Sequence, residues 1–261
     1  MRLASWNINS VRLRIKSIIN FIKNFNIDIL CLQETKTEDR YFPIEDFKKN
    51  GYPFFHFTGQ KSYNGVAVIT KIPIIKNGII NWCGIAEARH VLVKLENNFL
   101  IHNFYVPAGG DIPDVKANPK FKYKLEFLKE MIDFFSKDTA SCKVLAGDLN
   151  IAPSQYDVWS HNQLLNVVSY TEVERELLSK LIDRGKWVDI IRSNNKFDEK
   201  LYSWWSYRNK DWKKSNRGRR LDHIFVSQDL KPNVKMTQIC KEIRGEIKPS
   251  DHVPIIVEFD L

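Results

Sequence analysis

Short apolar runs recur along the chain, and between them lie stretches whose apolar residues are spaced as on one face of a helix. The runs that predict strands are 2–8, 27–32, 65–70, 91–95, 99–106, 143–147, 187–191, 202–207, 221–227 and 253–259. The helical spacing falls at 11–25, 121–135 and 171–184. This pattern predicts an α/β protein in which helices pack over sheets.

The connections between these runs indicate how the strands pair. Strand and helix alternate early in the chain, whereas the runs between 65 and 106 are joined by short polar links such as 96–98, which suit antiparallel pairing. We therefore expect mixed sheets, and two of them face to face would make a four-layer sandwich. No linker-like segment, internal repeat or low-complexity tract divides the chain, which predicts a single domain over 1–261.

Composition adds a charge asymmetry. Lys and Arg number 40 against 31 Asp and Glu, a formal net charge of +9, which favours a polyanionic partner such as nucleic acid but equally fits a basic surface that serves solubility. The four cysteines are widely separated, which argues against a thiolate zinc site and a disulfide framework. No apolar run approaches about 18 residues, and we expect a cytoplasmic protein with no membrane partner.

Polar side chains that can do chemistry gather where strands begin or end. Those that follow a strand are Asn7, Glu34, Tyr105, Asp148 and Asn150, and those that precede one are Asp222, Asp251 and His252. In a mixed sheet, the carboxyl ends of some strands meet the amino ends of their antiparallel neighbours at one edge. We therefore expect these residues to converge at one edge of the fold.

Such a set suits a hard cation such as Mg²⁺ or Mn²⁺, because carboxylate and amide oxygens are the ligands that these ions prefer. A cation held there would neutralise charge on a phosphate group. Each short motif also has a purely structural interpretation. Gly-Asp-x-Asn at 147–150 is a common turn, and Ser-Asp-His at 250–252 is a plausible loop cap.

The motifs taken together are far more specific than any one of them, because they span nearly the whole chain in order. The chain resembles the exonuclease III type of abasic-site endonuclease, within the endonuclease/exonuclease/phosphatase fold. The matching motifs are Ser-Trp-Asn-Ile-Asn-Ser-Val-Arg (5–12), Leu-Gln-Glu-Thr-Lys (32–36), Tyr-Asn-Gly-Val-Ala (63–67), Tyr-Val-Pro (105–107), Gly-Asp-Leu-Asn (147–150), Ser-Trp-Trp-Ser-Tyr-Arg (203–208), Asn-Arg-Gly-Arg-Arg-Leu-Asp (216–222) and Ser-Asp-His-Val-Pro (250–254).

The resemblance implies a role for each residue at the strand ends. Glu34 is then the principal metal ligand, with Asp251 and the amide of Asn7 close to the same metal. Asp148 activates water, and Asn150 orients both. The metal is Mg²⁺, with Mn²⁺ as an alternative.

The resemblance implies that two further residues contact the phosphate group and that a third supports one of them. Tyr105 contacts the scissile phosphate or steadies the leaving oxygen, His252 binds phosphate, and Asp222 is hydrogen-bonded to that histidine. The resemblance also implies the fold, two packed mixed sheets flanked by helices with the site at their shared edge.

A basic, aromatic segment separates this chain from lipid and inositol-phosphate phosphodiesterases that share the same acidic residues. Between Trp204 and Arg220 there are seven Lys or Arg residues against one Asp, interleaved with tryptophans, which offers phosphate contacts and flat apolar surfaces. By resemblance, Trp204 and Leu221 line the pocket for a flipped-out abasic sugar, whereas alternation suggests that Trp205 and Tyr207 belong to the core. The other candidate DNA contacts are Asn216, Arg208, Lys213, Lys214 and Arg219.

The chain departs from the family pattern at two places near the expected site. Ala108 follows Tyr-Val-Pro where many relatives carry Asn or Gln, so a side-chain contact to phosphate is missing there. Arg219 stands where others place Trp or Leu in the pocket wall. We expect looser pocket selectivity and a stronger grip on phosphate.

The sequence thus predicts a monomeric, Mg²⁺-dependent DNA repair phosphodiesterase that cuts duplex DNA 5′ to abasic sites. By resemblance it also acts at 3′ ends, as a 3′→5′ exonuclease and 3′-phosphatase. The alternatives are a lipid or inositol-phosphate phosphodiesterase of the same fold, and a DNA-binding scaffold that has lost catalysis. The scaffold predicts erosion of the acidic residues, yet all of them are present.

Overall fold

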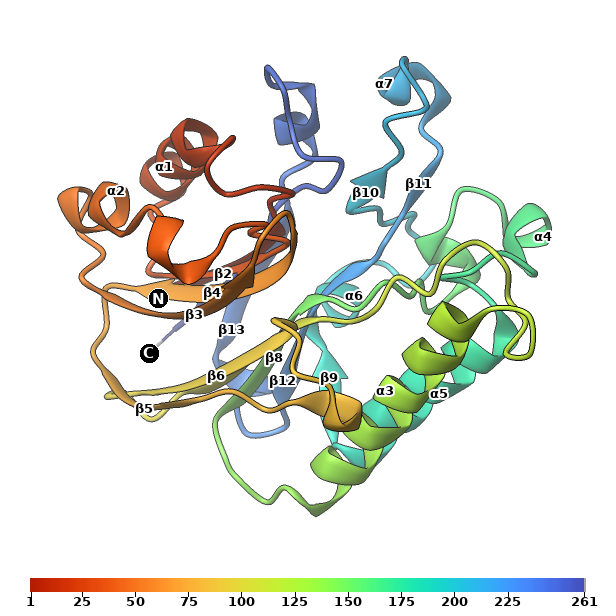
Figure 1. Ribbon diagram of the computed structural model, residues 1–261, viewed down its shortest axis with the longest axis horizontal. Coiled ribbons are helices and arrows are strands. Elements are labelled where there is room, and N and C mark those ends of the chain that lie inside the picture. The colour runs from red at the N-terminus through yellow and green to blue at the C-terminus, as the bar shows by residue number, and fades with distance from the viewer. Residues whose placement is uncertain (261) are drawn as a thin grey trace.

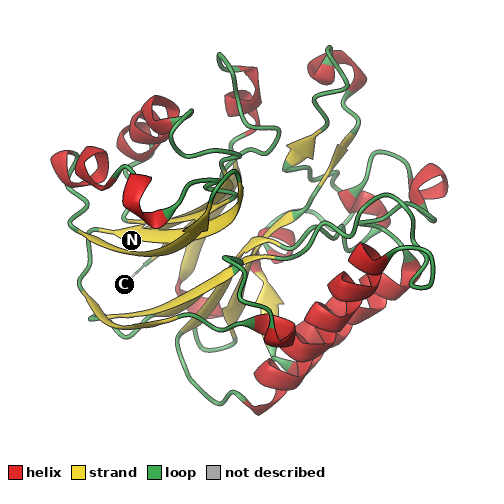
Figure 2. Cartoon of the chain, viewed as in Figure 1, coloured by secondary structure: helices red, strands yellow, loops and turns green. Residues whose placement is uncertain are grey.

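Two six-stranded mixed sheets lie face to face in the computed structural model, which describes residues 1–260 (Figures 1 and 2). The first sheet has the order β13 (Val234–Ile239), β14 (Ile255–Phe259), β1 (Arg2–Asn7), β2 (Ile29–Gln33), β4 (Tyr63–Thr70) and β3 (Phe54–Gln60). The second has the order β5 (Ile74–Gly78), β6 (His90–Leu95), β7 (Leu100–Tyr105), β8 (Lys143–Asp148), β12 (Asp222–Ser227) and β9 (Trp187–Asp189). Their facing sides share one buried apolar core, to which β2, β4, β6 and β8 all contribute.

Helices cover the outer face of each sheet, which completes four layers (Figure 2). The first sheet carries α1 (Ile15–Asn24) and α2 (Ile44–Lys49), and the second carries α3 (Pro119–Lys137) and α5 (Glu172–Arg184). The predicted α/β sandwich of two mixed sheets is confirmed. Among residues 1–260, no helix is both long and apolar enough to cross a membrane.

The remaining elements are short. They are α4 (His161–Leu164), α6 (Ile190–Ser193), α7 (Trp212–Ser215), a two-stranded ribbon of β10 (Trp204–Trp205) and β11 (Gly218–Arg219), and the 3₁₀ turns η1 (Asp39–Tyr41), η2 (Trp82–Gly84), η3 (Gln155–Asp157), η4 (Lys231–Asn233) and η5 (Lys241–Gly245). The ribbon and α7 project beyond the sheets beside one edge of the sandwich (Figure 1).

Strand direction brings the predicted residues to that edge. β1 runs parallel to β2 and β7 runs parallel to β8, so each pair ends on the same side. β12 is antiparallel to β8, which places Asp222 directly opposite Asp148. β14 is antiparallel to β1, so the segment before β14 returns to the end of β1. The expected convergence of strand ends is confirmed.

The sequence pattern fails mainly at the margins of the sheets. β3, β5 and β13 were not predicted, and all three are edge strands whose residues are mostly half-buried or exposed, so they lack a clear apolar signal. The strand predicted at 187–191 ends at 189, because the Asp189 side chain accepts the Arg192 N–H and starts α6. The strand predicted at 202–207 is reduced to Trp204–Trp205.

A buried ion-pair network fixes the segment that leads into β12. Arg220 belongs to the basic segment, yet its side chain is fully buried, with Nε 2.7 Å from Asp157 Oδ1 and Nη2 2.8 Å from Asp189 Oδ2. Its interpretation as part of a phosphate-binding surface is therefore wrong. Arg220 instead holds the backbone immediately before Leu221 and Asp222, because its own N–H also donates to the Asp157 carbonyl at 2.8 Å.

This network makes the stability depend on pH. Burial opposes ionisation of Asp157, but the Arg220 guanidinium outweighs it and holds the pKa of this carboxyl well below its usual range. The resulting stabilisation is complete above the unfolded-state pKa of about 3.9 and is lost as the pH falls toward the folded-state pKa.

We expect Asp157→Asn to lower the free energy of unfolding at pH 7 by about 3 kcal/mol, because it leaves the Arg220 charge only partly compensated. The deficit should shrink below about pH 4. Urea unfolding between pH 3 and 7 measures it, with Glu176→Gln on the exposed face of α5 as the control. A deficit that is the same at both ends of this range would contradict the assignment.

Candidate active site

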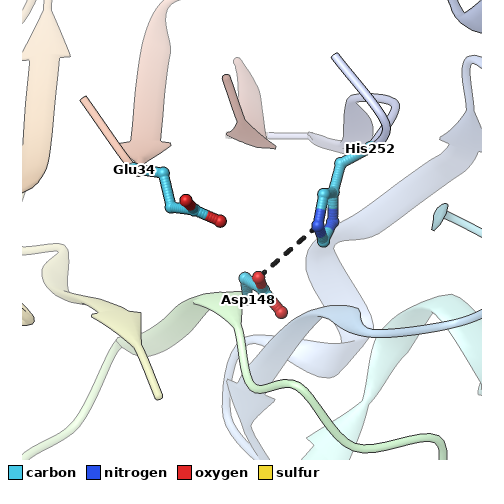
Figure 3. A group of neighbouring side chains, drawn as sticks. All are labelled: Glu34, Asp148 and His252. Atoms are coloured by element: carbon cyan, nitrogen blue, oxygen red, sulfur yellow. Dashed lines mark ion pairs between the residues drawn. The ribbon is translucent and has the colours of Figure 1, made fainter. Parts of the chain in front are cut away.

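Polar side chains from both sheets meet in a cleft of about 960 Å³. The predicted residues that line it are Glu34, Tyr105, Asn150, Trp204, Arg208, Arg219, Leu221, Asp251 and His252. Figure 3 shows Glu34, Asp148 and His252 facing one another from three different segments of the chain. The structure thus brings together residues from distant parts of the sequence.

Asn7 links the two carboxylates of the cleft. Its Nδ2 donates to Glu34 Oε1 and to Asp148 Oδ2, both at 2.8 Å. Its Oδ1 accepts the N–H of Asn9 at 3.1 Å, so the amide presents its nitrogen to the carboxylates. Asn7 is fully buried, and it therefore acts as a rigid bridge between the first and second sheets.

Asp148 lies at the end of β8 and is held by the residue two positions later. Asn150 donates its backbone N–H to Asp148 Oδ1 at 2.9 Å and its side-chain Nδ2 to Oδ2 at 3.2 Å. Burial raises the pKa of Asp148 to about 7, against the opposing effect of the positive charge on His252. A carboxylate with that pKa can accept a proton from water at neutral pH.

His252 and Asp222 form a buried pair beside Asp148. His252 Nδ1 lies 2.8 Å from Asp222 Oδ2, which also accepts the Ser203 hydroxyl at 2.6 Å. Burial opposes the charged imidazole, but Asp222 and Asp148 outweigh it and raise the pKa of His252 to about 10. The imidazolium therefore presents Nε2, 3.7 Å from Asp148 Oδ2, as a charged donor.

The donor atoms of the cleft suit a divalent cation. Glu34, Asp148 and His252 each offer one ligand atom, and these atoms all lie within 4.8 Å of one another. A charged imidazole is a poor ligand, whereas the two carboxylates are good ligands for a hard cation. Glu34 Oε2 lies 2.8 Å from the Lys36 ammonium.

Asp251 connects to the carboxylates only indirectly. Its Oδ1 accepts Asn9 Nδ2 at 3.1 Å and its Oδ2 accepts Trp204 Nε1 at 3.0 Å. The predicted metal-binding roles of Asp251 and Asn7 thus stay predictions. Sequence reasoning did not single out Asn9 and Lys36, although each lies two positions after a chosen residue in a quoted motif. Lys36 Nζ also donates to Asn9 Oδ1 at 2.6 Å.

Tyr105, at the end of β7, contributes a neutral hydroxyl. Burial, reinforced by Glu34 and Asp148, raises its pKa well above the ordinary value for tyrosine, so the phenol stays protonated. The guanidinium of Arg89 lies 5.1 Å from the centre of its ring, and Arg89 Nη1 donates to the Tyr105 carbonyl at 3.3 Å. Tyr105 is therefore a fixed hydrogen-bond donor at the cleft.

Trp204, Arg219 and Leu221 form one wall of the cleft. The Arg219 guanidinium lies 5.4 Å from the centre of a Trp204 ring, and Leu221 packs in the same apolar cluster as Trp204. Arg219 Nη1 donates to Ser169 Oγ at 2.7 Å, so the arginine is anchored in the wall. Arg219 therefore places a charged, flat guanidinium group in the wall, at the position where the family pattern has an apolar Trp or Leu.

The other residues predicted to bind DNA lie in different surroundings. Lys213 and Lys214 are exposed on α7 and do not line the cleft. Asn216 ends α7, and its Oδ1 accepts Trp205 Nε1 at 3.2 Å and Lys241 Nζ at 3.0 Å. Trp205 is buried, as predicted, but Tyr207 is 47% exposed, and its placement in the core was wrong.

Two packed mixed sheets with an acidic, histidine-bearing cleft at their shared edge define a hydrolase of phosphate esters. The chain belongs to the endonuclease/exonuclease/phosphatase family, whose model matches residues 4–252.

Named proteins support this membership over full length. The chain is 33% identical over 273 residues to exodeoxyribonuclease III of Haemophilus influenzae, covering 99% of this chain and 100% of that one. The chain is also similar to two solved structures, and each of these comparisons covers 100% of this chain and 100% of the other chain. One is an AP endonuclease from Archaeoglobus fulgidus, with a TM-score of 0.93 and 31% identity. The other is the 3′ phosphatase NExo from Neisseria bound to a product DNA hairpin, with a TM-score of 0.92 and 28% identity.

The His252–Asp222 pair should act as a unit in phosphodiester cleavage. We expect His252→Ala and Asp222→Ala each to reduce kcat strongly, and the double variant to lose much less than the product of the two single effects. Steady-state kinetics on the four proteins measures the coupling. His56→Ala, on the edge strand β3, is the control and should leave kcat unchanged. Multiplicative losses in the double variant would contradict the pair.

Proposed function

We propose that this protein is a divalent-metal-dependent DNA repair nuclease that incises duplex DNA on the 5′ side of an abasic site and leaves a 3′ hydroxyl. The same site would also act at 3′ ends, as a 3′→5′ exonuclease and 3′-phosphatase. One arrangement carries the proposal: the buried Asp148 carboxylate accepts a hydrogen bond from the Asn7 amide at 2.8 Å and lies 3.7 Å from His252 Nε2, at a cleft whose wall is aromatic and basic. The similar proteins named above support it.

Each side chain of the site has a separate proposed role in the reaction. Asp148 takes a proton from water, whose oxygen attacks phosphorus while the bond from phosphorus to the 3′ oxygen breaks. The leaving 3′ oxygen takes up a proton from the surrounding water and becomes the 3′ hydroxyl. Asn150 holds Asp148 in place for this transfer. His252 Nε2 and the Tyr105 hydroxyl donate to phosphate oxygens, where negative charge builds up.

Glu34 is the residue that would hold the cation, which we propose to be Mg²⁺ with Mn²⁺ as an alternative. When bound, the cation neutralises charge on the phosphate group. The Asn7 amide fixes the Glu34 carboxylate from one side, and the Lys36 ammonium contacts its other oxygen. We also propose that residues 1–261 act as one domain and as a monomer.

Selection of an abasic site requires more than the acidic residues, because these residues would act on the phosphodiester group, which is the same at an abasic site and at an intact nucleotide. The wall formed by Trp204, Arg219 and Leu221 offers a flat surface against which a sugar without its base can lie. The exposed cations of the segment 208–217 favour the DNA backbone over a neutral lipid surface. A lipid or inositol-phosphate substrate is therefore the weaker candidate.

Cleavage of an end-labelled duplex that contains one abasic site tests the proposal, with an intact duplex, a 3′-phosphate duplex and phospholipid vesicles as parallel substrates. We expect incision at the abasic site, abolished by EDTA. Glu34→Gln should raise the Mg²⁺ concentration for half-maximal activity by about tenfold, because it removes a charge that binds a reluctantly dehydrated cation.

The matched control is Glu38→Gln, four residues away on an exposed turn, which should leave the Mg²⁺ requirement unchanged. Full activity in EDTA would contradict the metal dependence. An unchanged half-saturation for Glu34→Gln would exclude this residue as the ligand. Hydrolysis of phospholipid without incision of DNA would replace the proposed function by the lipid alternative.

A further inference from the structure

An ion pair with both side chains fully buried lies behind the cleft, between the two helices that cover the second sheet. Lys124 Nζ on α3 lies 2.5 Å from Glu174 Oε1 on α5, and neither side chain is accessible to solvent. Burying two charges costs desolvation energy, and an apolar pair of similar volume would join two helices at least as well. The pair therefore needs an explanation other than helix packing.

Lys124 also contacts the loops that follow β7 and β8. Its ammonium donates to the Asn150 carbonyl at 2.8 Å and to the Ala108 carbonyl at 3.4 Å. Gly109 packs directly on the lysine stem, since a Cβ atom there would lie 2.8 Å from Lys124 Cδ. Asn150 has a left-handed backbone, φ +54°, which non-glycine residues adopt only when neighbouring contacts hold it.

Glu174 fixes a third loop of the cleft. Its carboxylate accepts the Ser169 N–H at 2.9 Å, the Thr171 N–H at 3.1 Å and the Thr171 hydroxyl at 2.6 Å. The Ser169 hydroxyl in turn accepts Arg219 Nη1, the charged group of the pocket wall. The buried pair thus touches the three loops that carry Asn150, Ala108 and Ser169.

We propose that Lys124 and Glu174 are positioning residues that set the geometry of Asp148 and of the Arg219 wall through these loops. The inference rests on the proposed function, since it assigns Asp148 as the proton acceptor. Lys124 acts through Asn150, whose backbone and side chain both bond to Asp148. Displacement of a catalytic group by about 1 Å can cost up to a hundredfold in rate, so a loosened Asn150 should reduce kcat more than KM.

The test compares Lys124→Met with the double variant Lys124→Met/Glu174→Gln. The single variant leaves a buried, unpaired charge and should be destabilised. In the double variant, the amide side chain at position 174 is neutral and keeps an acceptor oxygen for the Ser169 and Thr171 N–H groups, so the melting temperature should recover. Activity on an abasic duplex is then measured at a temperature well below the melting temperature of the double variant. Under these conditions the double variant should still show a kcat reduced about tenfold, with KM changed much less.

Lys143→Met/Asp138→Asn is the matched control. Lys143 begins β8 at the end remote from Asp148, and its Nζ lies 3.1 Å from Asp138 Oδ2 in another largely buried pair. This control should leave kcat unchanged. Hydrogen exchange provides a readout without activity: the amides of 148–152 should exchange faster in the Lys124 variants than in the control.

The outcomes separate the two proposals. An abasic duplex left uncut by the wild-type enzyme overturns the proposed function. A wild-type enzyme that cuts it, together with a double variant of normal kcat and normal exchange at 148–152, overturns the positioning role. A loss of kcat in proportion to the melting temperature in both the double variant and the control would also overturn it, since any buried pair would then have the same effect.

Discussion

The site depends on one side chain that joins the two sheets. Asn7 ends β1 in the first sheet, and its amide donates to Glu34 beside it and to Asp148 across the sandwich. Deeper between the sheets, Gln33 Nε2 donates to Asn103 Oδ1 at 2.7 Å, again from the first sheet to the second. Apolar contact is non-directional and alone would let the sheets slide, whereas these polar bonds fix their relative position. The strand ends of the two sheets that carry the site residues therefore keep a fixed position relative to one another.

The turns that follow these strands are conformationally costly. Glu34, Asn9, Ser10 and Asn150 all have left-handed backbones, with φ between +47° and +94°, which is uncommon outside glycine. Hydrogen bonds such as that from the Ser10 N–H to the Glu34 carbonyl, at 2.8 Å, compensate for this strain. The sharp turns let the side chains leave the sheet edge and face the cleft. Stability is thus exchanged for precise placement of Glu34 and Asp148 at the cleft.

Much of this arrangement follows from the sequence, because buried central strands have a strong apolar signal and their polar ends mark the site. Features that depend on contacts with residues distant in the chain cannot be predicted in this way. Arg220 has the same sequence context as the exposed lysines of its segment, yet it is buried by Asp157 and Asp189, which are distant in the chain. The Lys124–Glu174 pair is hidden for the same reason, since each residue alone resembles a solvated helix position. Edge strands such as β13 carry too few buried residues to be recognised.

The proposed site depends on the Asn7 amide, which holds Glu34, the proposed cation ligand, and Asp148, the proposed proton acceptor, in place at the edge shared by the two sheets. The most direct measurement is a titration with Mn²⁺, followed by the electron paramagnetic resonance of the free ion, for the wild type and for Asn7→Leu, which has a similar volume but no donor. We predict saturable binding by the wild type and an affinity about tenfold or more weaker in the variant, as for other residues that orient metal ligands. Equal affinity in the two proteins, or no saturable binding by the wild type, would contradict the account.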